Sequence, residues 1–122
     1  MKLDNLQEWT KLGRFIETGK KVDGVNIIHS MDPSVCQVKD DKFRAYFSNR
    51  NKNNQSVIYS TDLSLLSPID TATINPKPIL TPGELGAFDD NGVTASCVVK
   101  DSGLWYLYYI GWKPRSTTRF GL

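Results

Sequence analysis

The residues of this chain that could do chemistry are aspartates placed directly ahead of strand-like runs. Asp32 follows the lone His29, precedes Pro33, and stands at the start of an alternating run. Asp89 and Asp90 hold the same position ahead of a second run. Because a carboxylate can act as acid, base or nucleophile, these side chains are the first candidates for a reactive or binding site.

Each candidate also has a structural interpretation, which the sequence leaves open. Aspartate commonly bonds to the backbone nearby, so Asp32 could serve only to start a strand. The segment DDNG that begins at Asp89 contains three residue types that all favour a plain turn. A lone histidine such as His29 is often structural, so we treat it as a secondary candidate.

Composition limits the class of protein. A chain of 122 residues with three Trp, five Tyr and five Phe can bury one modest core, which predicts a single domain. Its 15 basic and 13 acidic residues are scattered, so nucleic acid is not an expected partner. No apolar run approaches the roughly 20 residues that cross a bilayer, and MKLDNLQEW lacks the apolar part of a signal peptide. We therefore expect a soluble, cytoplasmic protein with no membrane partner.

The two cysteines do not indicate a metal centre. Cys36 and Cys97 each lie in a strand-like run without a second Cys or a His nearby. Cysteine is among the most often buried residue types, so we expect both to be buried free thiols. No pattern in the sequence predicts a metal or any other cofactor.

The elements that would position the aspartates occur twice. SVCQVKDDKFRAYFSNR resembles ASCVVKDSGLWYLYYIGW, which follows about sixty residues later, and the second turn appears one residue longer. Each copy reads as a β-hairpin with a turn of Asp, Ser, Lys or Gly. The predicted hairpin strands are residues 34–39 and 43–48 in the first copy, and 94–100 and 105–112 in the second.

Two further strands complete the first copy. Residues 56–60 form a third predicted strand and residues around 72–74 a fourth, so the first unit spans about 30–75, whereas the second, about 89–122, ends as its third strand begins. Bulky residues alternate onto both sides, which suggests sheets covered on both faces. Repeated four-stranded antiparallel units of this kind are typical of β-propeller blades. The N-terminal residues 9–16 favour a strand, although their apolar spacing also permits a helix.

Strand reversal would bring the polar residues together. In an up-and-down blade, the entrance to the first strand and the loop between the second and third lie at one end. That end would collect carboxylates, a guanidinium, an amide and an indole, a set that suits carbohydrate. Its members would be Asp32, Asp89, Asp90, Asn49, Arg50 and Trp112, with His29 beside them.

Two stretches, HSMDPSV…DDKFRAYFSNR and GELGAFDDNGVTASCVV…GLWYLYYIGW, resemble the five-bladed β-propeller glycosidases. The likeness is greatest to the glycosyl-hydrolase-like proteins of bacterial polysaccharide loci, with a more distant similarity to glycoside hydrolase families 43 and 32. It covers roughly residues 9–122. The fold that it implies is all-β, with about one and a half to two blades of a five-bladed propeller.

The resemblance also implies roles for the aspartates. It assigns nucleophile or general base to Asp32, and to Asp89, with Asp90 as its neighbour, the tuning of a general acid. That acid is a Glu of a later blade in these families and has no matching position here; Glu84, the nearest substitute, does not match the motif. Because glycoside hydrolysis needs two carboxyl groups across the scissile bond, Asp32 and Asp89 alone would lack the leaving-group acid.

These observations lead to one expected function and one alternative. We expect a glycoside hydrolase-related, carbohydrate-active protein with an incomplete propeller and little or no turnover by itself. The alternative is a non-catalytic carbohydrate-binding or assembly module, and a truncated product without activity is a third reading. Open strand edges and an uncovered blade face also predict a homo-oligomer that pairs blade edges or stacks blades between copies.

Overall fold

A computed structural model describes residues 11–64, 73–114 and 119–121 of the chain. Over these residues the protein is all-β, and they include no helix, hence none that could cross a membrane. The strands are β1 (Lys20–Val22), β2 (Val25–Ile27), β3 (Met31–Lys39), β4 (Lys42–Arg50), β5 (Ser56–Ser64), β6 (Thr73–Ile74), β7 (Gly92–Asp101), β8 (Leu104–Trp112) and β9 (Arg119–Gly121).

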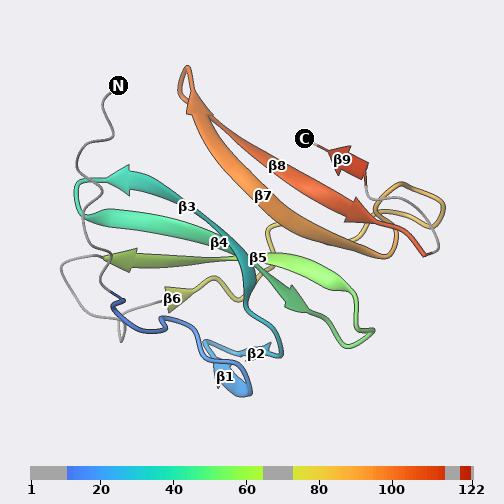
Figure 1. The fold of residues 1–122 in the computed structure, drawn as a ribbon, viewed down its shortest axis with the longest axis horizontal. Coiled ribbons are helices and arrows are strands. Elements are labelled where there is room, and N and C mark those ends of the chain that lie inside the picture. Colours follow the sequence, from blue (N-terminus) through green and yellow to red (C-terminus); the bar gives the residue numbers. More distant parts are fainter. Residues whose placement is uncertain (1–10, 65–72, 115–118, 122) are drawn as a thin grey trace.

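The first unit is an antiparallel sheet in the order β3, β4, β5, β6 (Figure 1). Strands β4 and β5 pair without interruption from Lys42 opposite Ser64 to Arg50 opposite Ser56. Aromatic and β-branched residues such as Phe47, Tyr59 and Val57 suit this pleated, half-buried surface. All four strands predicted for this unit are present, and β3, β4 and β5 are longer than the sequence indicated.

The second unit is the hairpin of β7 and β8, to which β9 adds a short third strand. A single parallel bridge, Ser56 opposite Gly92, joins it to the first unit. From that point the β7–β8 hairpin diverges from β5 (Figure 1), and β7 contacts β3 and β4 of the first unit. The sheets do not close on themselves.

Both hairpins turn through two residues, so the prediction of a longer second loop is wrong. Lys39 faces Lys42 in the first hairpin, and Asp101 faces Leu104 in the second. The one-residue difference between the two copies is accommodated within the strands. Their pairing register shifts between Gln37 and Lys39 in the first hairpin and between residues 95 and 97 in the second. A bulge accommodates an extra residue in one strand while leaving the turn short.

One hydrophobic core lies between the first sheet and the N-terminal segment. Phe47 of β4 and Ile74 of β6 are buried against Ile16, Val25 and Ile27. The ring of Tyr59 stacks on that of Phe47 with centroids 6.2 Å apart. The cover on this face is the small hairpin of β1 and β2, which appears below the sheet in Figure 1.

A second core lies on the opposite face of the same sheet. Ile58 of β5 is buried against Val93 and Ala95 of β7, and Tyr46 and Leu107 pack around them. Neighbours along a strand point to opposite sides, which is why Tyr46 and Phe47 enter different cores. The first sheet is therefore covered on both faces, as its alternation predicted.

The N-terminal prediction is wrong where it can be assessed. Of the predicted strand 9–16, residues 9 and 10 lie outside the described residues, and residues 11–16 form neither strand nor helix. Ile16 instead enters the first core as part of an irregular segment. The β1–β2 hairpin was not predicted, although its turn, Asp23-Gly24, is a residue pair typical of tight hairpins.

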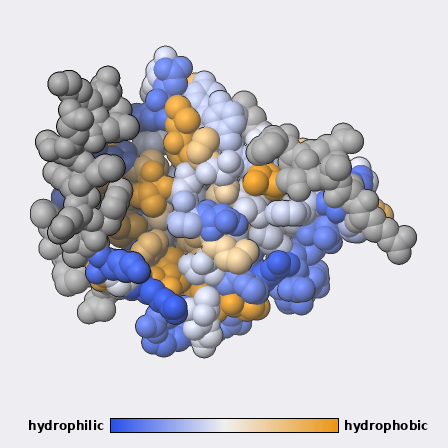
Figure 2. Space-filling view, in the orientation of Figure 1, coloured by the Kyte–Doolittle hydropathy of each residue, from blue (hydrophilic) through white to orange (hydrophobic). Residues whose placement is uncertain are grey.

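The prediction that both thiols are buried is also wrong. Cys36 is half-buried, and burial raises the pKa of its thiol. Cys97 is exposed because it points away from the first unit, opposite Tyr108 on β8. Hydrophobic side chains are likewise visible among polar ones on the molecular surface (Figure 2).

A close approach between the second sheet and the loop before it generates a stability prediction. A methyl group at Gly111 would stand 2.5 Å from the Phe88 ring and 2.7 Å from Cβ of Asp89. Because both neighbours are packed, we expect Gly111→Ala to lower the free energy of unfolding by about 2 kcal/mol in urea titrations. Ser96→Ala, at an exposed position of β7, should change it by less than about 0.5 kcal/mol. Equal stability of the two variants would contradict this packing.

Candidate functional site

The pairing register brings several strand ends to one edge of the molecule. Met31 at the start of β3 faces Ser48 near the end of β4. Arg50, the last residue of β4, faces Ser56 at the start of β5. The bridge from Ser56 to Gly92 and the pair of Gly92 with Trp112 then add the start of β7 and the end of β8. We call this edge the rim; its candidate side chains are Asp32, Arg50, Asp89, Asp90 and Trp112.

Asp32 has an unusual backbone conformation. Its φ is 51°, in the left-handed region, and it lies where the pairing of β3 shifts between Met31 and Ser34. The other described non-glycine residues with positive φ are in turns or loops between strands, whereas Asp32 is inside a strand. Non-glycine residues in this region are strained, and such strain clusters at functional sites. Its side chain is exposed to solvent.

Asp89 is held inside the protein. The residue is only 7% exposed, and its Oδ2 accepts a 3.1 Å hydrogen bond from the hydroxyl of Tyr109. A Cβ at Gly83 would overlap the carboxylate, so glycine there leaves the space that Asp89 occupies. Burial, followed by the hydrogen bond and charge of Asp89, raises the pKa of Tyr109. Asp89 therefore organises the loop and β8 and does not present its carboxylate at the surface.

Asp90 joins the same loop to the rim. Its Oδ2 accepts a 2.9 Å hydrogen bond from the backbone N–H of Gly86, and its carbonyl accepts one of 3.2 Å from Nε2 of Gln55. Its Oδ1 is buried and has no hydrogen-bond partner among the described residues. Lys113 donates to the carbonyl of Gly86 at 2.6 Å, so the turn is fixed from both sides.

Asn49 connects the first sheet to the segment before β3. Its Oδ1 accepts hydrogen bonds from the backbone N–H groups of Ile28 and His29 at 3.0 and 3.1 Å, and its Nδ2 donates to the carbonyl of Asn26 at 2.8 Å. With 1% of its surface exposed, Asn49 fixes the chain on its approach to Asp32. It is placed to support the rim and not to contact a ligand.

The two other polar candidates, His29 and Arg50, are both half-buried. The backbone N–H of His29 is fixed by its hydrogen bond to Asn49. Arg50 ends β4, where its Nη1 donates to the carbonyl of Asn54 at 2.7 Å and so closes the loop between β4 and β5. Glu84, considered as a substitute acid, lies in the exposed turn where Ala87 N–H donates to its carbonyl.

Trp112 is the aromatic residue of the rim. Its indole Nε1 donates a 2.8 Å hydrogen bond to Oγ1 of Thr94, which in turn lies 3.2 Å from Oγ of Ser56. The residue nevertheless remains 43% exposed. A ring fixed through its nitrogen but open to solvent can stack on an apolar ligand face without losing much conformational entropy.

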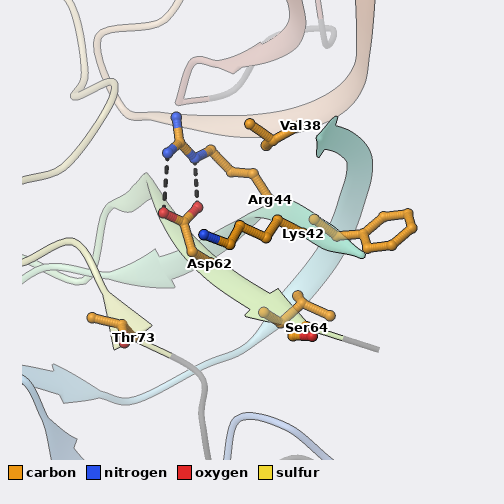
Figure 3. Close-up of a pocket in the computed structure, with 8 residues that line it drawn as sticks. Val38, Lys42, Arg44, Asp62, Ser64 and Thr73 are labelled. Atoms are coloured by element: carbon orange, nitrogen blue, oxygen red, sulfur yellow. Dashed lines mark hydrogen bonds and ion pairs between the residues drawn. The ribbon is translucent and has the colours of Figure 1, made fainter. Parts of the chain in front are cut away.

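A separate pocket of about 330 Å³ lies at the other end of the first sheet, and sequence reasoning missed it. Arg44 and Asp62 form a two-pronged ion pair in it, with distances of 2.6 and 3.0 Å, and Figure 3 shows Lys42 beside them. Asp62 raises the pKa of Arg44. Only the register between β4 and β5 could have indicated this pair. Both carboxylate oxygens of Asp62 are already bonded to the guanidinium of Arg44.

The arrangement offers binding groups more readily than a catalytic pair. At the rim Asp32 and Trp112 are exposed and Arg50 and Asp90 are half-buried, while the Asp89 carboxylate is buried and bonded to Tyr109. Among the described residues, no three His, Cys, Asp or Glu side chains gather closely enough to hold a metal ion. Accepting hydrogen bonds from ligand hydroxyls and stacking an aromatic ring are what this edge can do directly.

Comparisons with known proteins provide relatives without an assigned activity. No protein-family model matches the chain, and no solved structure matches it significantly. It is 36% identical over 104 residues to the uncharacterized proteins MT1551 and Rv1502, from two strains of Mycobacterium tuberculosis. The match covers 85% of this chain but 34% of each relative, so the chain spans about a third of the length of the curated relatives it matches.

The contact between Tyr109 and Asp89 predicts a loss of stability in alkali. Because the folded state raises the pKa of Tyr109, its contribution is fully present below pH about 10 and is lost as the pH rises through that raised pKa. We expect Tyr109→Phe to lose about 1 kcal/mol at pH 7 and to show a smaller further loss between pH 9 and 11. Urea titrations across this range measure both effects.

Tyr59→Phe, in the other core, is the matched control for the removal of a tyrosine hydroxyl. An unchanged alkaline loss in Tyr109→Phe would contradict a raised pKa of Tyr109 in the folded protein.

Proposed function

We propose that this chain binds carbohydrate at its rim, as part of a glycosidase-related β-propeller. Two observations carry the proposal: a strained, exposed aspartate near the start of β3 and a fixed, exposed indole at the end of β8. Asp32 supplies the acceptor for sugar hydroxyls, and Trp112 supplies the apolar platform for a sugar ring. The likeness to propeller glycosidases supports the same ligand class.

Features of the fold support the propeller part of the proposal. Two similar antiparallel units lie against each other, and the entrance of each first strand is at the same edge. The loop between them, residues 81–91, carries the second unit's aspartates to that edge. In a propeller, stacking of neighbouring blades buries the faces that one blade alone leaves open.

Binding without turnover agrees better with the geometry than hydrolysis does. A glycosidase needs one protonated and one ionised carboxyl group across the scissile bond. Asp32 is accessible, but Asp89 is buried behind Tyr109 and Asp90 is bonded to Gly86. The described rim thus offers one open carboxylate, which can accept hydrogen bonds but cannot also protonate a leaving group.

Glycan binding tests the proposal through Asp32→Asn. Asparagine tolerates the left-handed conformation as aspartate does, so the substitution removes the charge and preserves the turn. On a glycan array, followed by calorimetry with the best oligosaccharide, we expect at least a tenfold loss of affinity, about 1.4 kcal/mol. Trp112→Ala should cause a similar loss because it removes the stacking surface.

Two variants at the other end of the sheets are matched controls. Asp40 has a similar φ of 50° in a hairpin turn, and Trp105 is similarly exposed at the far end of β8. Asp40→Asn and Trp105→Ala should leave the affinity unchanged. Failure of the wild-type chain to bind any glycan, or equal losses in the controls, would refute a rim site.

A role in glycoside hydrolysis is the second candidate. It rests on the conformation of Asp32, the residue to which the resemblance assigns nucleophile or general base, and on relatives of which the matched part makes up only 34%. In this reading the chain alone hydrolyses no aryl glycoside detectably. Turnover by the wild-type chain that disappears in Asp32→Asn would replace the binding proposal with the hydrolytic one.

A further inference from the structure

Thr94 is a buried polar residue of the second unit that connects two parts of the molecule. It is the third residue of β7 and only 5% exposed. Its Oγ1 accepts the 2.8 Å hydrogen bond from Nε1 of Trp112 and lies 3.2 Å from Oγ of Ser56, the first residue of β5. One hydroxyl of the second unit therefore contacts both the aromatic residue of the rim and the first unit.

The pairing of the strands explains why these three side chains meet. Trp112 faces Gly92 across the β7–β8 hairpin, two residues before Thr94, and residues two apart on a strand share a side. Thr94 and Trp112 therefore lie on one side of this hairpin as diagonal neighbours. Ser56 is brought beside them by its parallel bridge to Gly92. A Cβ at Gly92 would stand 3.1 Å from the backbone nitrogen of Ser56, so glycine permits this close approach.

The hydrogen-bonding capacity of the three groups fixes the direction of the first contact. An indole nitrogen can only donate, so Oγ1 of Thr94 must be the acceptor for Trp112. Either hydroxyl can donate in the contact between Thr94 and Ser56, and in both cases Ser56 helps to fix the position of Oγ1. Loss of the Thr94 hydroxyl would leave the indole N–H without this acceptor, and loss of the Ser56 hydroxyl would leave the acceptor less well held.

We infer that Thr94 and Ser56 are positioning residues for the aromatic part of the rim. Their hydroxyls hold the Trp112 ring in one orientation. Because Ser56 belongs to the first unit, this orientation depends on how the two units are joined. The inference extends the proposed carbohydrate site, on which its functional consequence rests.

The same hydrogen bond restricts what Trp112 offers to a ligand. The only donor of the indole is bonded to a buried acceptor, while the residue remains 43% exposed. The ring therefore provides apolar contact and no hydrogen bond. A ring that is ordered before binding also reduces the conformational entropy lost when a ligand stacks on it.

Solvent exchange of the Trp112 indole N–H, followed by NMR on the whole chain with isotopically labelled tryptophan, measures this positioning without a ligand. The signal is assigned by its loss in Trp112→Phe. Thr94→Val removes the acceptor and keeps the branched shape, so we expect exchange to become about fivefold faster. Thr94→Ser retains a hydroxyl and should exchange as the wild type does. Ser56→Ala, in the other unit, should accelerate exchange about twofold.

Thr61→Val is the matched control for Thr94→Val. Thr61 of β5 is 1% exposed, and its Oγ1 donates a 3.0 Å hydrogen bond to the carbonyl of Thr73, so this variant also loses a buried hydroxyl. It should reduce stability and leave exchange of the Trp112 N–H unchanged. Ser96→Ala, at an exposed position of β7, is the control for Ser56→Ala. Equal acceleration in Thr61→Val and Thr94→Val would show a general loss of stability and contradict positioning.

Calorimetry with the best oligosaccharide from the glycan array separates this inference from the proposed function. We expect Thr94→Val to bind about fivefold more weakly and Thr94→Ser to bind as the wild type does. Faster exchange in Thr94→Val, in a chain that binds no glycan, would refute the carbohydrate site and uphold the positioning of Trp112. Exchange and affinity that are unchanged in both Thr94→Val and Ser56→Ala would overturn the inference and leave the carbohydrate proposal intact.

Discussion

Burial of apolar side chains on both faces of the first sheet is the constraint on which this structure depends. Phe47 faces the N-terminal hairpin, and Ile58 faces the second sheet. Full burial of one such side chain is worth about 1.5–3 kcal/mol, against a net stability of about 5–15 kcal/mol for a typical domain. Neither cover is therefore dispensable. The positions of the two covers determine where the strand ends lie, and therefore where the rim lies.

The hairpins could be predicted from sequence because their signals are local. Alternation along residues 43–48 and 105–112 and the turns between strands fix each pair without reference to the rest of the chain. The N-terminal segment could not be predicted in this way, because its apolar spacing fits more than one structure. Ile16 is placed by its contact with Phe47, a partner far along the chain. Exposure of Cys97 likewise depends on which side of β8 meets the first unit.

The candidate site likewise has features that local sequence patterns predict and features that depend on distant contacts. Antiparallel reversal alone predicts that Asp32, Asp89 and Trp112 lie at one edge, and the register has them there. Which of these side chains are accessible depends on partners that no local pattern reveals. Tyr109 closes off Asp89, and backbone groups of residues 26–29 occupy Asn49. The unusual φ of Asp32 also has no signal in the sequence beyond the tolerance of aspartate for it.

The two-sided cover of the first sheet has a consequence for synthesis of the chain. The N-terminal hairpin leaves the ribosome before the first sheet does. The second sheet shields Ile58, but its strand β8 ends about fifty residues after Ile58. At roughly 5–20 residues per second, that interval is several seconds. During this time Ile58 and Tyr46 face the solvent of the translating cell, so we expect this surface to be where the nascent protein is most exposed to chaperones and to misassembly.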